Sequence, residues 1–190
     1  MADKPIDLKQ VASDCREFAQ QFQSLQLATT SGEGVPEASY APFFRDGRDF
    51  YVYVSELSRH TANLSQNPRA SVLLIENEAD ARHLFARRRL TYQCDCEEVP
   101  RGSDPFDTAL DGFQEKFGDF IGMLRNLEDF HLFRVSPYTG TFVTGFARAF
   151  EMIGEQLDEV RHINDVGHRA ANKKTDEQMA ETEKQQNEPA

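Results

Sequence analysis

A run of three arginines, Arg87-Arg88-Arg89, is an unusual feature of the sequence. The run opens a β-rich segment, so Arg87 and Arg89 are expected to face one side and Arg88 to share the other with Leu90 and Tyr92. Three adjacent cations repel one another unless anions offset them, which makes the run a candidate site for carboxylates or phosphate. The alternative is a solvated strand edge whose charges oppose aggregation. The residues alone leave both interpretations open.

The five histidines are not arranged as a recognisable catalytic or zinc motif, and the sequence has neither a phosphate-binding glycine loop nor a nucleophile elbow. His83, His131 and His162 have no partner suggested by spacing and are expected to be surface or structural residues. His168 lies in the segment 165–169, just before a polar tail. Position alone therefore predicts a solvated side chain for His168.

Three cysteines, Cys15, Cys94 and Cys96, form no disulfide framework, which favours a reducing compartment. Cys94 and Cys96 are two residues apart in a strand and therefore point to the same face. They are expected to be core residues, because two thiolates do not complete a structural metal site. A net charge of -11 disfavours nucleic acid as a partner. No apolar run is long enough for a membrane span and the N-terminus does not resemble a leader, so we expect a cytoplasmic protein without membrane insertion.

The first half of the chain predicts a helix followed by antiparallel strands. Apolar residues recur at three and four positions over residues 5–23, which indicates an amphipathic helix lying against a larger body. Glycine-bearing turns at residues 32–34 and 46–48 suit hairpins. A short helix is expected over residues 58–66 and a helical turn over 78–85. The β-rich runs are residues 25–30, 37–44, 50–55, 70–76 and 88–97.

The second half predicts one or two helices over residues 104–127, interrupted by Gly118. Two further strands are expected at 129–136 and 141–152, joined by a turn at 137–140. About seven strands with a few helices predict a mainly β (α+β) fold built on a small antiparallel barrel. We expect a single domain over residues 1–170, and a polar tail over 171–190 that is disordered or loosely helical.

Six sequence blocks resemble one family. They are LQLATTSGEGVPEASYAPF (25–43), SRHTANLSQNPRASVLLIE (58–76), LFARRRLTY (84–92), LEDFHLFRVSP (127–137), GTFVTGFARAF (140–150) and GHR (167–169). Together they are similar to the heme-utilisation, heme-degrading proteins, within the pyridoxamine 5'-phosphate oxidase-like group of flavin-binding split barrels. The first two blocks are shared with the flavin relatives, whereas FARRRL, LEDF and GHR are typical of the heme branch.

The resemblance implies an antiparallel split β-barrel that forms a homodimer with heme between the protomers. His168 matches the axial ligand of the heme iron, and Asp129 matches an acidic residue that accepts the ring N–H of that histidine across the interface. Arg89 matches a basic residue of the heme site, and Arg87 is a further candidate from the same run. His60 falls where flavin relatives place cofactor-phosphate contacts, although a structural role is the alternative.

The function implied by the resemblance is oxygen-dependent heme degradation, in which the porphyrin ring is opened to a biliverdin-type product and iron is released. Molecular oxygen and an electron donor of unknown identity are then required partners. Two alternatives remain open: an FMN-dependent oxidoreductase of the same fold, and a non-catalytic heme carrier or storage protein. His131, which lies close to Asp129, is a competing imidazole for the iron, and the long polar extension after Arg169 departs from the family pattern.

Overall fold

The structure is a computed structural model that describes residues 6–163 and 173–187. The described chain divides into two compact units, which we treat separately. Residues 21–73 and 92–138 form the barrel unit. The terminal unit comprises the described parts of residues 1–20, 74–91 and 139–190. Strands β4, β5 and β6 contribute residues to both units.

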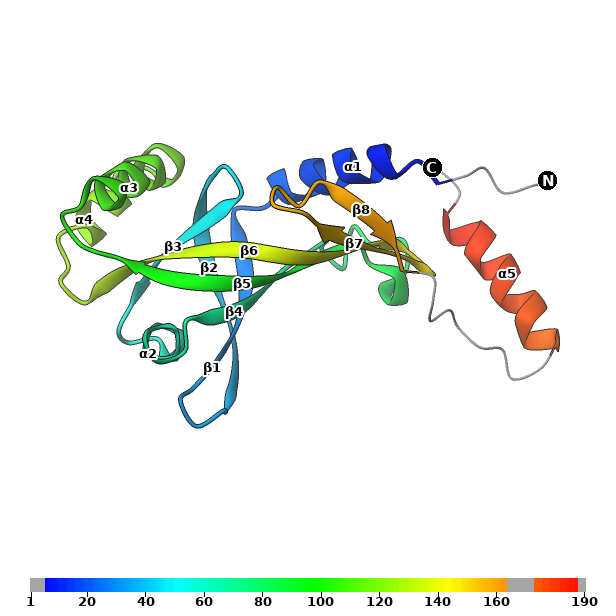
Figure 1. Cartoon of the computed structure of the whole chain (residues 1–190), viewed down its shortest axis with the longest axis horizontal. Coiled ribbons are helices and arrows are strands. Elements are labelled where there is room, and N and C mark those ends of the chain that lie inside the picture. Colours follow the sequence, from blue (N-terminus) through cyan, green and yellow to red (C-terminus); the bar gives the residue numbers. More distant parts are fainter. Residues whose placement is uncertain (1–5, 164–172, 188–190) are drawn as a thin grey trace. The chain divides into compact units, whose positions relative to one another are not determined.

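Six antiparallel strands close the barrel. In order around it they are β3-β2-β1-β4-β5-β6, and an additional pairing of β3 with β6 completes the circle. This confirms the predicted fold, mainly β with flanking helices and built as an antiparallel split barrel. The strands are β1 (Ser24–Thr30), β2 (Pro36–Asp46), β3 (Asp49–Ser55), β4 (Arg69–Ile75), β5 (Arg89–Val99) and β6 (Phe130–Gly145) (Figure 1).

The barrel interior follows from alternation along its strands. In β1 every second side chain is buried, including those of Leu25 and Leu27. Cys94 and Cys96 are buried in the same way on β5 and carry free thiols, as expected for core residues. Burial raises the pKa of both thiols, that of Cys96 to about 12, so neither supplies a thiolate near neutral pH.

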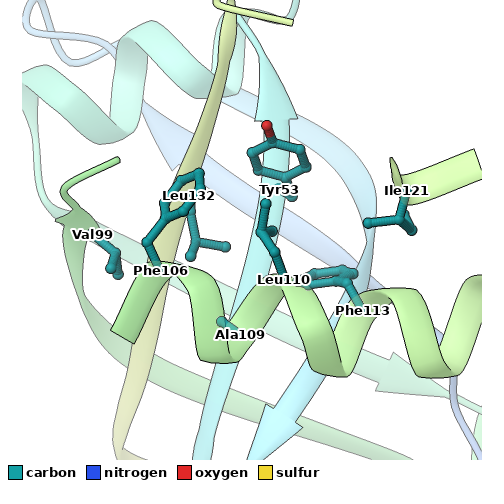
Figure 2. Close-up of a cluster of buried hydrophobic side chains, with 8 residues drawn as sticks. All are labelled: Tyr53, Val99, Phe106, Ala109, Leu110, Phe113, Ile121 and Leu132. Atoms are coloured by element: carbon teal, nitrogen blue, oxygen red, sulfur yellow. The ribbon is translucent and has the colours of Figure 1, made fainter. Parts of the chain in front are cut away.

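The helices α3 (Asp104–Phe117) and α4 (Phe120–Leu124) confirm the prediction of helical structure interrupted at Gly118, whose φ of +77° ends α3. The hydroxyl of Ser103 accepts from the N–H of Phe106 and begins α3. Figure 2 shows the inner face of α3 against side chains of β3 and β6. The buried cluster comprises Tyr53, Val99, Phe106, Ala109, Leu110, Phe113, Ile121 and Leu132.

The predicted turn at residues 137–140 is wrong. Strand β6 runs unbroken from Phe130 to Gly145, and the chain reverses only at residues 146–147, where Ala147 has a φ of +56°. Pro137 lies between the pairing of β6 with β3, which ends at Val135, and its pairing with β7 (Arg148–Ile153), which begins at Gly140. Neither β3 nor β7 therefore needs the missing N–H of Pro137.

The terminal unit contains α1 (Leu8–Gln20), β7, β8 (Glu159–His162) and α5 (Lys173–Asn187). The amphipathic helix predicted over 5–23 is α1, which packs on β8 and brings the Phe18 ring 5.5 Å from that of Phe142. Strand β8 was not predicted. The helical turn expected at 78–85 is confined to a 3-10 turn, η1 (Leu84–Ala86). Within residues 6–163 and 173–187, no helix is long and apolar enough to cross a membrane.

Candidate functional site

Asp129 directly precedes β6 and is held against the end of β3. The pairing of Ser55 with Phe130 brings the two segments together. The N–H of Glu56 donates to the carbonyl of Asp129 at 2.9 Å, and the hydroxyl of Ser55 donates to Asp129 Oδ2 at 2.9 Å. The described part of the chain makes no hydrogen bond to Oδ1. One oxygen of this half-buried carboxylate is therefore fixed, while the other can accept a further donor.

His60 lies on α2 (Arg59–Gln66), the short helix that follows β3 and was predicted over 58–66. Its Nδ1 lies 2.9 Å from the hydroxyl oxygen of Ser39, which itself donates to the carbonyl of Leu27 at 3.2 Å. With the Ser39 hydroxyl donating to Leu27, Nδ1 donates to Ser39 and Nε2 keeps a lone pair. Burial lowers the pKa of His60, which favours the neutral ring.

The start of α2 is attached to the same end of β3 as Asp129. The N–H of Ser58 donates to the carbonyl of Ser55 at 3.0 Å, and the hydroxyl of Thr61 donates to that carbonyl at 2.5 Å. In the barrel unit, Asp129 and the start of the helix that carries His60 are thus both attached to the end of β3, although the two site residues are far apart in sequence.

His131 lies two residues after Asp129 and contacts two carboxylates. Its Nδ1 is 2.6 Å from Glu98 Oε1 and its Nε2 is 2.8 Å from Glu56 Oε1. These hydrogen bonds raise the pKa of His131, because each carboxylate favours the protonated ring. With both nitrogens donating, the imidazole has no lone pair for a metal. The arrangement therefore disfavours His131 as a competing ligand.

The three arginines of the run have different surroundings in the terminal unit. Arg87 is largely buried: its Nε donates to the carbonyl of Glu76 at 3.1 Å, and its Nη1 lies 3.2 Å from Glu78 Oε1. Arg88 pairs with the Glu76 carboxylate. Arg89 donates only to the carbonyl of Arg87, at 3.1 Å, and has no ion-pair partner in the part of the chain described. Most N–H groups of its guanidinium are therefore available to donate to an anion.

The other histidines have local contacts. His83 Nδ1 accepts from the N–H of Phe85, and His162 stacks on the ring of Phe150. Among residues 6–163 and 173–187, no group of three or more His, Cys, Asp or Glu side chains could hold a metal ion. His168 lies outside the described residues. A heme iron needs few protein ligands, so the donor set to be tested is an imidazole with a carboxylate partner.

Sequence reasoning did not identify Ser55 or the carboxylate pair of Glu56 and Glu98. A serine at the end of a strand is common, and the distance along the chain between Ser55 and Asp129 conceals their contact. The signal that was available is weak: Ser55 ends a β-rich run, and Asp129 begins another. Only the register of β3 with β6 places the two side chains together.

A closed six-stranded antiparallel barrel, with its helices outside and a polar cluster at one strand end, defines a protein of the split-barrel class. The model of the pyridoxamine 5'-phosphate oxidase family matches residues 12–144. The heme oxygenase HutZ of Vibrio cholerae is 40% identical over 156 residues, which cover 82% of this chain and 88% of that protein. The chain therefore belongs to the heme-utilisation proteins of the pyridoxamine 5'-phosphate oxidase-like group.

Solved structures agree with this assignment. The crystal structure of Vibrio cholerae HutZ, described there as a heme storage protein, matches with a TM-score of 0.66 and 38% identity, covering 76% of this chain and 96% of that one. Campylobacter jejuni ChuZ matches with a TM-score of 0.79 and 30% identity, over 90% of this chain and 69% of its own. The family predicted from the sequence blocks is thereby confirmed.

Proposed function

We propose that this protein binds heme and degrades it with molecular oxygen and electrons from a donor, opening the porphyrin to a biliverdin-type product and releasing iron. The observation that carries the proposal is the Asp129 carboxylate, whose Oδ2 is fixed by Ser55 and whose Oδ1 accepts from no donor among the described residues. The similarity to a relative named as a heme oxygenase supports the same function. Heme supplies the oxygen chemistry when bound, and the protein residues orient and support it.

His168 is the proposed axial ligand, and the protein acts as a homodimer in which Asp129 accepts the ring N–H of His168 of the partner subunit. A carboxylate in this position fixes the imidazole tautomer and increases its donor strength toward iron. The neighbouring His131 fits the ligand role poorly, since both its nitrogens contact carboxylates. His83 Nδ1 already accepts from a backbone N–H, which leaves the proton on Nε2 in the neutral ring.

Arg89 is proposed as the cationic contact of the heme. Its guanidinium can donate to a heme carboxylate or to an oxygen atom in the site, because one hydrogen bond to the Arg87 carbonyl leaves most of its N–H groups available. Arg87 is also proposed to contribute to heme binding. Its guanidinium contacts the Glu76 carbonyl and the Glu78 carboxylate, so its proposed role is to hold the start of β5. His60 is proposed as a further contact through its Nε2 lone pair.

A heme storage role is the second candidate, because the structure of the relative HutZ is described as that of a heme storage protein. It needs the same ligand but no turnover. FMN, suggested by the family as a whole, is the alternative cofactor. A cytoplasmic location is part of the proposal, in keeping with three buried free cysteines.

The test is the absorption and resonance Raman spectrum of purified protein with added heme, then with reductant in air. We expect an iron–histidine band in the wild type that is lost in His168→Ala and kept in His131→Gln. Loss of the heme bands with appearance of a biliverdin-type product supports degradation, whereas stable bound heme supports storage. A wild-type band that survives in His168→Ala would overturn the ligand assignment. Bound FMN with no heme affinity would overturn the function.

A further inference from the structure

We propose that Ser55 is a positioning residue for the heme site: its hydroxyl holds the Asp129 carboxylate with Oδ2 occupied and Oδ1 presented to the axial imidazole. The inference rests on the proposed function and adds a residue that none of the sequence blocks singled out. Its basis is the geometry at the end of β3, where Ser55 Oγ lies 2.9 Å from Asp129 Oδ2.

The direction of this hydrogen bond is fixed by a second contact. The N–H of Leu57 donates to Ser55 Oγ at 3.2 Å, so one lone pair of the hydroxyl oxygen is already used. The carboxylate has no proton to give when ionised, and the hydroxyl proton therefore points to Oδ2. The resulting order of donors is Leu57 N–H to Ser55 Oγ, then Ser55 O–H to Asp129.

The backbone of Ser55 is held as firmly as its side chain. Its carbonyl accepts from the hydroxyl of Thr61 and from the N–H of Ser58, and Ser55 pairs with Phe130 in the β3–β6 ladder. Asp129 is fixed on its own side by the Glu56 N–H, which donates to its carbonyl. Because both backbones are held in this way, the hydroxyl selects the rotation of the carboxylate and not the position of the chain.

The geometry has one consequence for an imidazole that approaches Asp129. A carboxylate held at Oδ2 offers Oδ1 in one direction, so the ring that donates to it has one orientation on the iron. Removing the hydroxyl of Ser55 should therefore alter the donor strength of the ligand toward iron.

The experiment compares Ser55→Thr with Ser55→Val, two side chains of nearly equal shape that both suit a strand and differ only by the hydroxyl. The iron–histidine Raman band of the full-length, ferrous heme complex is measured at one fixed pH, with Asp129→Asn alongside. We expect Ser55→Thr to match the wild type. Ser55→Val should displace the band in the same sense as Asp129→Asn.

Ser65→Ala is the matched control, because it removes a hydroxyl that donates to the carbonyl of Thr61 within α2, and its spectrum should be unchanged. The double variant Ser55→Val/Asp129→Asn should show no more displacement than Asp129→Asn alone, since one group acts through the other. A normal band in Ser55→Val beside a displaced one in Asp129→Asn would overturn the role of Ser55. If Asp129→Asn has no effect on bound heme, the proposed function of Asp129 fails, and the inference fails with it.

Discussion

The Nδ1 atom of His131 lies 2.6 Å from Oε1 of Glu98, across the neighbouring strands β6 and β5. With Glu56 on its other nitrogen, the ring connects three segments of the barrel unit. The raised pKa of His131 means that the folded state binds a proton more tightly than the unfolded chain. Its contribution to stability is therefore complete below the unfolded value of about 6.5 and is lost as the pH rises through the folded pKa.

We predict that His131→Gln destabilises the protein by about 1 kcal/mol at pH 6 and by less at pH 8.5, because these partly exposed hydrogen bonds are screened by solvent. Thermal unfolding at both pH values measures the difference. His83→Gln is the control, since His83 is exposed and contacts no carboxylate among the described residues. A loss of stability that is the same at both pH values would contradict the ionic role of His131.

The pH dependence of stability that His60 contributes is opposite in sign to that of His131. The pKa of His60 is lowered by burial, so the unfolded chain takes up a proton at a higher pH than the folded protein does. The stability contribution falls as the pH drops below the ordinary value of 6.5 toward the folded pKa. We expect His60→Asn, which can still donate to Ser39, to cost about 1–3 kcal/mol at pH 7.5 and to weaken the acid sensitivity between pH 7 and 5. Urea unfolding measures both effects; unchanged acid sensitivity would contradict this account.

Gly112 lies on the inner face of α3, where an added Cβ would come within 2.4 Å of the Phe44 ring. We predict that Gly112→Ala destabilises the barrel unit by about 1–3 kcal/mol through this overlap, and that Phe44→Leu in the same chain recovers part of the loss. Gly122→Ala is the matched control on α4, because its Cβ would meet nothing closer than 3.9 Å. It should be neutral or gain up to about 1 kcal/mol from helix propensity. Chemical unfolding of the three variants and the wild type tests the contact.

Arg89→Ala should reduce heme turnover about tenfold or more while changing the free energy of unfolding by less than about 1 kcal/mol, since the Arg89 guanidinium makes one hydrogen bond, to a carbonyl, among the described residues. Arg69→Ala is the control: Arg69 forms an exposed ion pair with Asp95 at 3.7 Å and should leave turnover unchanged. Product formation under reductant and oxygen is the measurement. Wild-type turnover in Arg89→Ala would show that the cation does not serve the reaction.

The polar contacts at the end of β3 could not be predicted from the sequence, because hydrogen-bond partners there are chosen by strand register. Ser55 and Asp129 are 74 residues apart, and Glu98 is 33 residues from His131. A shift of one residue between β3 and β6 would turn Ser55 to the other face and break its contact with Asp129. The predicted turn at 137–140 failed for a related reason: a proline ends a strand only where a partner needs its N–H, and the sequence does not show the partner.

The sequence by itself determined the β-rich alternation, the hairpin turn at Gly47, the two helices separated by Gly118 and the blocks that indicate the family. These features depend on local backbone preferences and on the spacing of apolar residues, which are written in consecutive positions. The tertiary structure decided which oxygen of Asp129 accepts from Ser55 and that both nitrogens of His131 contact carboxylates. It also decided that the Arg87 guanidinium contacts Glu76, whereas that of Arg89 has no ion-pair partner within the described ranges. Such properties depend on which distant groups a folded chain brings within hydrogen-bond reach, and no local pattern specifies them.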